Sequence, residues 1–247
     1  MPPLVLHTAI ARSVADRMAS TLLDDERGSL YLGATAPDIR VITRWERERT
    51  HFFDLSNFDE QSGIAGFFEA YPSLVSPEEL APPATAFIAG YLTHLQMDEL
   101  WISTVYRPYF GERSGLGGGV RANILDRALQ FSLDCDRRRD AQFMSEVTGA
   151  IARSELDIHV GLLDPPTLRQ WHEVVLEIMG RPPEWERFRR AARRHLANGD
   201  DEDSEELLLS LPELVDEALR HLSPTRVDEF LERAAQSSLV AVKEYLA

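Results

Sequence analysis

Residues 83–105 read PATAFIAGYLTHLQMDELWISTV, and this stretch decides the fold class of the chain. A helix drawn through it is apolar on nearly every face, with Phe87, Leu92 and Trp101 among its large side chains. A helix of that kind is buried inside a protein. Pro83 suits the first turn, where an amide hydrogen has no intrahelical partner. The stretch therefore predicts a central, buried helix.

The rest of the chain repeats the helical spacing of apolar residues. One such stripe predicts a first helix running to about Leu23, and it consists of Leu6, Ala9, Ile10, Val14 and Met18. The alternation typical of a half-buried strand extends over only a few positions. We predict later helices at residues 121–135, 137–156, 165–179, 183–197, 205–221 and 224–246. The fold class is therefore predicted to be all-α.

Polar, glycine-rich and proline-rich segments predict the connections. They cover residues 24–28, 33–38, 56–63, 72–83 and 111–119, and an acidic linker covers 198–204. In the second of these segments, glycine and proline are expected to break regular structure and to hold Asp38 in a turn. A chain of 247 residues with 44% hydrophobic residues can bury one core without disulfides. We predict a single domain, with residues 1–110 as a metal-site half and 120–247 as a helical C-terminal half.

The charge of the chain argues against two classes of large partner. A formal net charge of −15 repels nucleic-acid phosphates and the anionic inner leaflet of a membrane. No run reaches the ~18–20 apolar residues needed to cross a bilayer. Cys135 is the single cysteine and the first residues lack a basic leader, which favours the reducing cytoplasm. We expect a cytoplasmic protein without nucleic-acid partner or membrane insertion.

His94 and Asp98 introduce chemistry into the buried helix. They lie four positions apart, so both side chains leave the same face about one turn apart. Both can therefore contact one ion, and a metal would compensate the cost of burying a carboxylate. The same pair also fits a hydrogen-bonded core histidine beside an exposed acid.

Three further residues extend the pair to a set of five. They are His7, Asp38 and His51, and each is next to apolar residues or to residues that constrain the backbone. Separately, each also fits a structural histidine or a turn-capping aspartate. Together, three histidines and two carboxylates can complete a tetrahedral zinc with an open water position, or two ions bridged by one carboxylate.

The order and setting of these residues resemble the zinc-dependent phospholipase C family. That family includes bacterial phosphatidylcholine-hydrolysing enzymes and the N-terminal domain of glycosylphosphatidylinositol-specific phospholipase D. The resemblance covers roughly residues 1–110. It is carried by HTAIA at 7–11, by Gly33 with APD at 36–38, by THF at 50–52, and by GYLTHLQMD at 90–98.

The resemblance implies a ligand set and a number of ions. Asp38, His51, His94 and Asp98 would hold one ion, while His7 would join Asp98 at a second. Family members also use their mature N-terminal amino group, whereas here Pro2 and Pro3 precede His7. Their third ion needs a His-x3-Glu pair, but Leu176 stands four residues after His172 and Glu177 follows one place late. We therefore expect one or two ions of zinc, or of another divalent metal.

The predicted function is hydrolysis of a small-molecule or lipid phosphoester. Asp38 is the candidate general base, accepting a proton from the attacking water. One alternative is a non-enzymatic protein in which a structural metal ties the first helix to the central one. Another is a single-strand nuclease-like phosphodiesterase, which the negative charge disfavours.

The remaining reactive or charged residues are interpreted as structural. His159 lies among apolar residues and is the candidate extra ligand, although a structural role is favoured. His172, His195 and His221 are expected at the surface. The flanking aspartates should raise the pKa of Cys135. Two basic clusters are interpreted as solvated helix faces: residues 137–139, and Arg187, Arg189, Arg190, Arg193 and Arg194.

Overall fold

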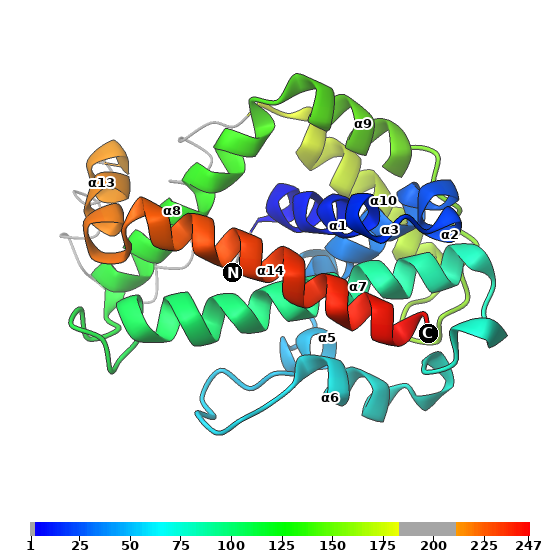
Figure 1. Ribbon diagram of the computed structural model, residues 1–247, viewed down its shortest axis with the longest axis horizontal. Coiled ribbons are helices and arrows are strands. Elements are labelled where there is room, and N and C mark those ends of the chain that lie inside the picture. The colour runs from blue at the N-terminus through cyan, green and yellow to red at the C-terminus, as the bar shows by residue number, and fades with distance from the viewer. Residues whose placement is uncertain (1–2, 183–210) are drawn as a thin grey trace.

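A long buried helix runs through the middle of the molecule, as residues 83–105 predict (Figure 1). The computed structural model describes residues 3–182 and 211–247 of the chain. The central helix is α7, Pro82–Trp101, and prolines occupy its first turn. It continues as the π-helix η4, Ile102–Phe110, which replaces the α-helical end expected near residue 105. Local π-helix is uncommon and frequently lies at functional sites.

Helices also make up the rest of the described chain. Before α7 come α1 (Leu4–Met18), α2 (Thr21–Asp25), α3 (Arg27–Thr35), η1 (Ala36–Ile39), α4 (Arg40–Thr43), α5 (Glu48–His51), α6 (Gly63–Ala70), η2 (Pro72–Leu74) and η3 (Pro77–Glu79). After it come α8 (Val120–Arg138), α9 (Ala141–Ile151), α10 (Pro165–Gly180), α13 (Leu211–Leu222) and α14 (Pro224–Tyr245). No strand occurs in residues 3–182 or 211–247, so the all-α prediction is confirmed.

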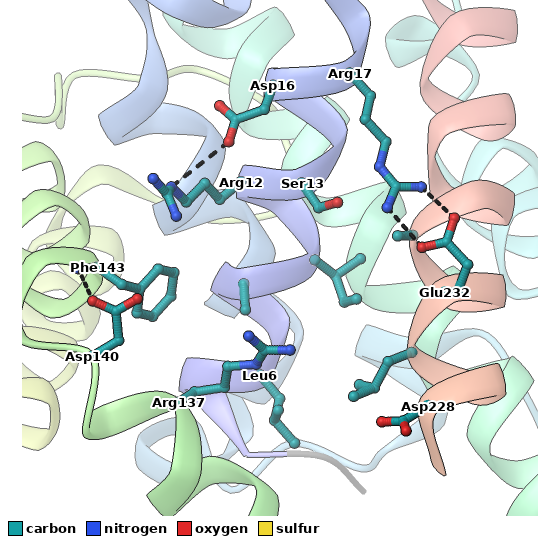
Figure 2. A pocket seen from close by; sticks show the side chains of 14 residues that line it. Leu6, Arg12, Ser13, Asp16, Arg17, Arg137, Asp140, Phe143, Asp228 and Glu232 are labelled. Atoms are coloured by element: carbon teal, nitrogen blue, oxygen red, sulfur yellow. Dashed lines mark hydrogen bonds and ion pairs between the residues drawn. The ribbon is translucent and has the colours of Figure 1, made fainter. Parts of the chain in front are cut away.

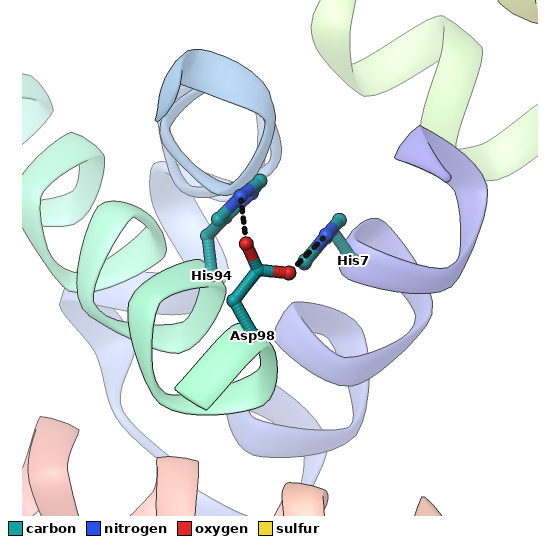
Figure 3. Close-up of side chains that lie close together, drawn as sticks. All are labelled: His7, His94 and Asp98. Atoms are coloured by element: carbon teal, nitrogen blue, oxygen red, sulfur yellow. Dashed lines mark ion pairs between the residues drawn. The ribbon is translucent and has the colours of Figure 1, made fainter. Parts of the chain in front are cut away.

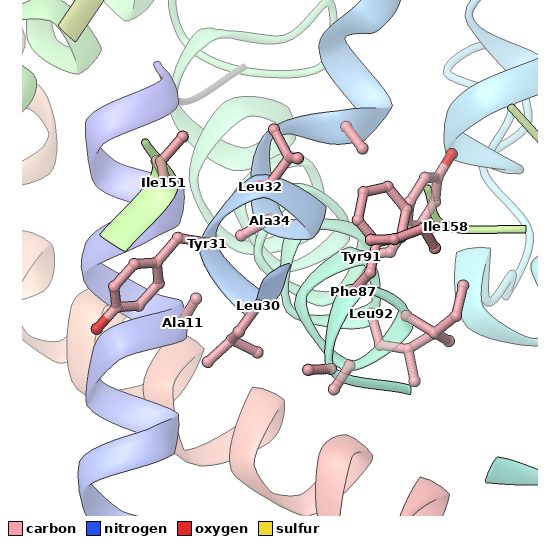
Figure 4. Close-up of a cluster of buried hydrophobic side chains, with 14 of the residues drawn as sticks. Ala11, Leu30, Tyr31, Leu32, Ala34, Phe87, Tyr91, Leu92, Ile151 and Ile158 are labelled. Atoms are coloured by element: carbon pink, nitrogen blue, oxygen red, sulfur yellow. The ribbon is translucent and has the colours of Figure 1, made fainter. Parts of the chain in front are cut away.

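The core consists of two hydrophobic clusters that meet along α7. The first cluster joins α7 to α1, α3, α9 and α10, and Figure 4 shows part of it, including Tyr31, Phe87 and Tyr91. The second cluster joins the end of α7 and η4 to α8, α13 and α14. Leu95 belongs to the first cluster and Met97 to the second. The described helices therefore form one domain in which α7 passes from one cluster to the other.

Two glycines let α3 and α7 touch through their backbones. A Cβ atom added to Gly90 would lie 1.9 Å from the Leu30 carbonyl oxygen, and one added to Gly33 would lie 2.0 Å from that of Phe87. Real Cβ atoms do not approach that closely, so only glycine fits both positions. The prediction that Gly33 breaks regular structure is wrong, because Gly33 lies inside α3 and serves close packing. The turn is the 3₁₀ helix η1, which contains Asp38.

Element boundaries differ from the sequence predictions at several connections. The first helix ends at Met18, where Ala19 adopts a left-handed conformation, and α2 follows separately. The loop predicted at 72–83 contains the 3₁₀ turns η2 and η3 and the start of α7. The break predicted near residue 136 lies after α8, and α9 ends at Ile151.

Three predictions concern segments outside the described residues. They are the helix at 183–197 with His195, the basic cluster of residues 187–194, and the acidic linker at 198–204. Of the helix predicted at 205–221, the structure describes α13. Among the helices in the described ranges, none combines the length and the apolar character that crossing a bilayer demands.

Candidate metal centre

The structure brings the five predicted side chains together beside the C-terminal half of α7. His94 and Asp98 leave one face of α7 toward His7 of α1, as Figure 3 shows. Asp38 of η1 and His51 at the end of α5 complete the group. The ligand atoms of His7, His94 and Asp98 lie within 4.8 Å of one another, as do those of Asp38, His51 and His94. Either group is compact enough for one metal ion.

The two oxygens of Asp98 face different histidines. Oδ2 lies 3.3 Å from His51 Nε2 and 3.6 Å from His94 Nε2. Oδ1 lies 3.6 Å from His7 Nε2. Because each oxygen has its own histidine neighbours, Asp98 can contact one ion with Oδ2 and a second with Oδ1.

Asp38 lies at the open edge of the cluster. Its Oδ1 is 3.8 Å from His51 Nε2, and its side chain is 22% exposed. The side chains of the other four residues are at most 3% exposed. Asp38 is therefore the residue of the cluster that contacts solvent.

Hydrogen bonds at Nδ1 orient two of the three imidazole rings. His94 Nδ1 lies 2.8 Å from the Ala34 carbonyl oxygen, near the end of α3. Since a carbonyl only accepts, the neutral ring donates from Nδ1 and presents the Nε2 lone pair to the centre. His51 Nδ1 lies 2.9 Å from Thr50 Oγ1, and His51 Nε2 lies 3.4 Å from His94 Nε2. Both rings thus face the centre with Nε2.

His7 lacks such a partner. Its ring stacks on His94 with 3.6 Å between the centroids, and neither of its nitrogens has a hydrogen bond among the described residues. Asp98 Oδ1 is likewise buried without a hydrogen-bond partner there. Unpartnered buried polar atoms are costly, and a cation between these two side chains would compensate both. The residues present therefore fit a divalent metal.

Burial and mutual charge set the protonation of the cluster. Burial lowers the pKa of His7 well below its ordinary value, and the neighbouring His94 lowers it further. Burial also lowers the pKa of His51, although Asp98 opposes this. For His94, burial is outweighed by the negative charge of Asp98, which raises its pKa. For Asp98, burial is outweighed by His94 and His51, which hold its pKa well below the ordinary range. Neutral His7 and His51 beside an ionised carboxylate suit metal binding.

Arg47 also belongs to the site, although it is not among the residues predicted from the sequence. Its side chain is 9% exposed, and one terminal nitrogen lies 3.4 Å from Asp98 Oδ2. The other terminal nitrogen donates to the Phe53 carbonyl oxygen over 2.8 Å. Burial lowers the pKa of Arg47, and Asp98 opposes this. The spacing offers a signal, because Arg47 precedes His51 by one helical turn and can face the same way.

The other titratable residues lie apart from the centre or differ from expectation. His159 is 74% exposed and pairs with Asp157, so it is outside the cluster. His221 is exposed, as predicted, whereas His172 is half-buried with Nε2 2.8 Å from the Ile151 carbonyl oxygen. Burial, with the charge of Asp134, raises the pKa of Cys135 to about 11, in the predicted direction.

Two cavities are lined by other residues. One of about 450 Å³ lies between α1, α9 and α14, with Leu6 and Phe143 at its apolar part and the Arg17–Glu232 ion pair at its rim (Figure 2). The other, about 440 Å³, lies beside η4 and α8 and includes Trp101 and the buried Asp126. The metal-ligand candidates line neither cavity.

Comparisons of the chain with protein-family models, with curated proteins and with solved structures gave no match.

Proposed function

We propose that this protein is a metal-dependent hydrolase of phosphoesters, with zinc as its metal. The observation that carries the proposal is the convergence of three imidazoles and two carboxylates around the unpartnered atoms of His7 and Asp98. Imidazole nitrogen and carboxylate oxygen are preferred ligands of zinc. The resemblance of residues 1–110 to the zinc-dependent phospholipase C family supports the same assignment.

The charge of the site supports an anionic substrate. Asp38, Asp98 and Arg47 together carry one net negative charge. One divalent ion reverses that sign, and a second makes the site strongly positive. A phosphoester would then be attracted to the open edge at Asp38, even though the whole chain is acidic.

A bound zinc ion supplies Lewis-acid activation of water and neutralises charge on a phosphoryl oxygen. Asp38, at the exposed edge, accepts the proton of the attacking water. The hydrogen bonds of His94 to Ala34 and of His51 to Thr50 hold both rings in place during the reaction. Arg47 contacts Oδ2 of Asp98, whereas His7 faces Oδ1, and the Arg47 contact helps to orient the carboxylate.

The test combines metal content with turnover. Elemental analysis of the purified protein should give one or two zinc ions per chain, and His94→Ala should lose them. Hydrolysis of a chromogenic phosphodiester should fall by about 10²–10⁴-fold in Asp38→Asn, while at least one zinc ion remains bound. Unchanged metal content and unchanged turnover in Asp38→Asn would remove Asp38 from the mechanism.

The same measurements distinguish a metal-dependent hydrolase from a protein in which the metal is only structural. The near-complete burial of His7, His51, His94 and Asp98 is the observation that favours a metal tying α1 and α5 to α7. A protein that contains stoichiometric zinc, unfolds when the zinc is removed and turns over no phosphomonoester, phosphodiester or phospholipid would support that alternative.

A further inference from the structure

The N-terminus of α1 is held by a side chain from a distant part of the chain. Pro3 precedes α1 and gives no side-chain cap, so the first amides of the helix need other partners. Asp134 of α8 provides one, because its Oδ1 accepts a hydrogen bond from the Val5 amide over 3.2 Å across 129 residues of sequence. A carboxylate at this position is also favoured by the helix dipole.

Asp134 is itself fixed by Arg138. The Arg138 Nε donates to Asp134 Oδ2 over 2.6 Å, and both side chains are at most 9% exposed. A terminal nitrogen of Arg138 faces the carbonyl oxygens of Ile178 and Met179, at the end of α10. The sequence interpretation of Arg138 as part of a solvated face is therefore wrong. Its guanidinium links α10 to the carboxylate that caps α1.

This cap lies two residues before His7. The rings of His94 and His51 are each oriented by a hydrogen bond at Nδ1, whereas the ring of His7 has no hydrogen bond to any residue that the structure describes. Two things therefore position the His7 ring: its stacking on His94 and the placement of the α1 backbone. Asp134 fixes that backbone at Val5, half a helical turn before His7.

We propose that Asp134 is a positioning residue for His7, and that it sets the affinity of the ion that His7 binds. This inference rests on the proposed metal centre. Replacement of a residue that orients a metal ligand typically weakens metal binding by about 10–100-fold. We expect that loss at His7, with little change at His51, whose ring is held by Thr50.

The experiment titrates zinc into the metal-free full-length protein and follows the imidazole nitrogens of each histidine by NMR. Assignments come from His7→Leu and His51→Leu variants. In the wild type, zinc should shift both rings. In Asp134→Ala, the shift of His7 should need about 10–100-fold more zinc, while that of His51 saturates as before. Asp134→Asn retains a side-chain oxygen that can accept from the Val5 amide. In this variant, the zinc concentration needed to shift His7 should lie between those of the wild type and Asp134→Ala.

Asp164→Ala is the matched control. Asp164 is also an aspartate that caps a helix, accepting from the Thr167 amide over 2.9 Å, but it serves α10 and is exposed. The Asp164→Ala substitution should leave the zinc titrations of both His7 and His51 unchanged. If Asp134→Ala does not fold, Asp134→Asn against the wild type makes the same comparison, with the weakening again confined to His7.

The possible results separate a failure of the positioning role of Asp134 from a failure of the proposed metal centre. If zinc shifts no histidine of the wild type, the metal centre itself is wrong. If zinc shifts both rings but His7 titrates alike in the wild type and the Asp134 variants, the centre stands and the positioning role is overturned. Equal weakening at His7 and His51 would also overturn it, because a general loss of structure affects both.

Discussion

At the scale of single residues, the central feature is a pair of stacked imidazole rings beside one carboxylate. His7 and His94 are in ring contact, and both lie near Asp98. Because protonating both rings would place like charges in contact, the pair takes up one proton more easily than two. Burial, and after it the neighbouring His94, lowers the pKa of His7, whereas the negative charge of Asp98 outweighs burial and raises the pKa of His94, so the proton favours His94.

This division predicts how the stability of the metal-free protein depends on pH. The unfolded chain takes up a proton on His7 near pH 6.5, its ordinary value, whereas the folded protein resists that proton. The contribution of His7 is therefore present above about pH 6.5 and is lost as the pH falls toward its lowered folded pKa. His94 acts in the opposite sense, because its pKa is raised.

Urea unfolding with a chelator present, measured between pH 5 and 8, tests the prediction. The free energy of unfolding of the wild type should decline on acidification more steeply than that of His7→Leu. Curves of equal slope for the two proteins would show that His7 is not held neutral by the fold.

The close crossing of α3 and α7 governs stability at the scale of elements. In Gly90→Ala, the new methyl group would meet the Leu30 carbonyl of α3, which cannot move independently of its helix. We expect a loss of about 1–3 kcal/mol or more in the free energy of unfolding. Because Ala34 and His94 lie across the same crossing, metal affinity should fall as well.

Gly149→Ala in α9 is the matched control for that substitution. Its added Cβ would meet only the end of the flexible Arg153 side chain, at 3.4 Å. An alanine there should stabilise the protein by about 0.5–1 kcal/mol, as in an ordinary helix interior. Equal effects of the two substitutions in urea unfolding would contradict the backbone contact at Gly90.

The elements show which parts of this structure can be predicted from sequence. The burial of α7 follows from an apolar pattern on all its faces, and the pairing of His94 with Asp98 follows from helical spacing. The helical state of Gly33 could not be derived, because it depends on an approach to α7 that no local pattern encodes. For Arg47 the sequence offers its spacing of one helical turn before His51, but the charged neighbours Glu46 and Glu48 are typical of an exposed segment, and its contact with Asp98 follows only from the fold.

At the scale of the whole molecule, the centre joins elements that are separate in sequence. Its residues come from α1, η1, α5 and α7, and α14 from the end of the chain packs on α1 and α7 (Figure 1). The metal-site half is thus covered by part of the C-terminal half. A ligand that binds only this assembled arrangement stabilises the folded state as a whole.

Zinc should therefore raise the unfolding temperature of the metal-free protein. At a free concentration of about 100 times the dissociation constant, the gain is about 2.7 kcal/mol. For a chain of this size, that corresponds to a rise of about 5–10 °C. Calorimetry or circular dichroism should show the rise in the wild type and in His159→Ala, and its absence in His94→Ala. A rise that persists in His94→Ala would place the bound zinc elsewhere.

The passage of α7 through both hydrophobic clusters limits how this sequence can change in length. Each residue of a helix advances the chain by about 100° around the axis. One residue inserted between Gly90 and His94 would thus turn His94 and Asp98 away from His7, or else turn Gly90 out of the crossing with α3. In homologous sequences, insertions and deletions should therefore occur in the connections before Pro82 and after Phe110. The interval from Gly90 to Asp98 should keep a constant length.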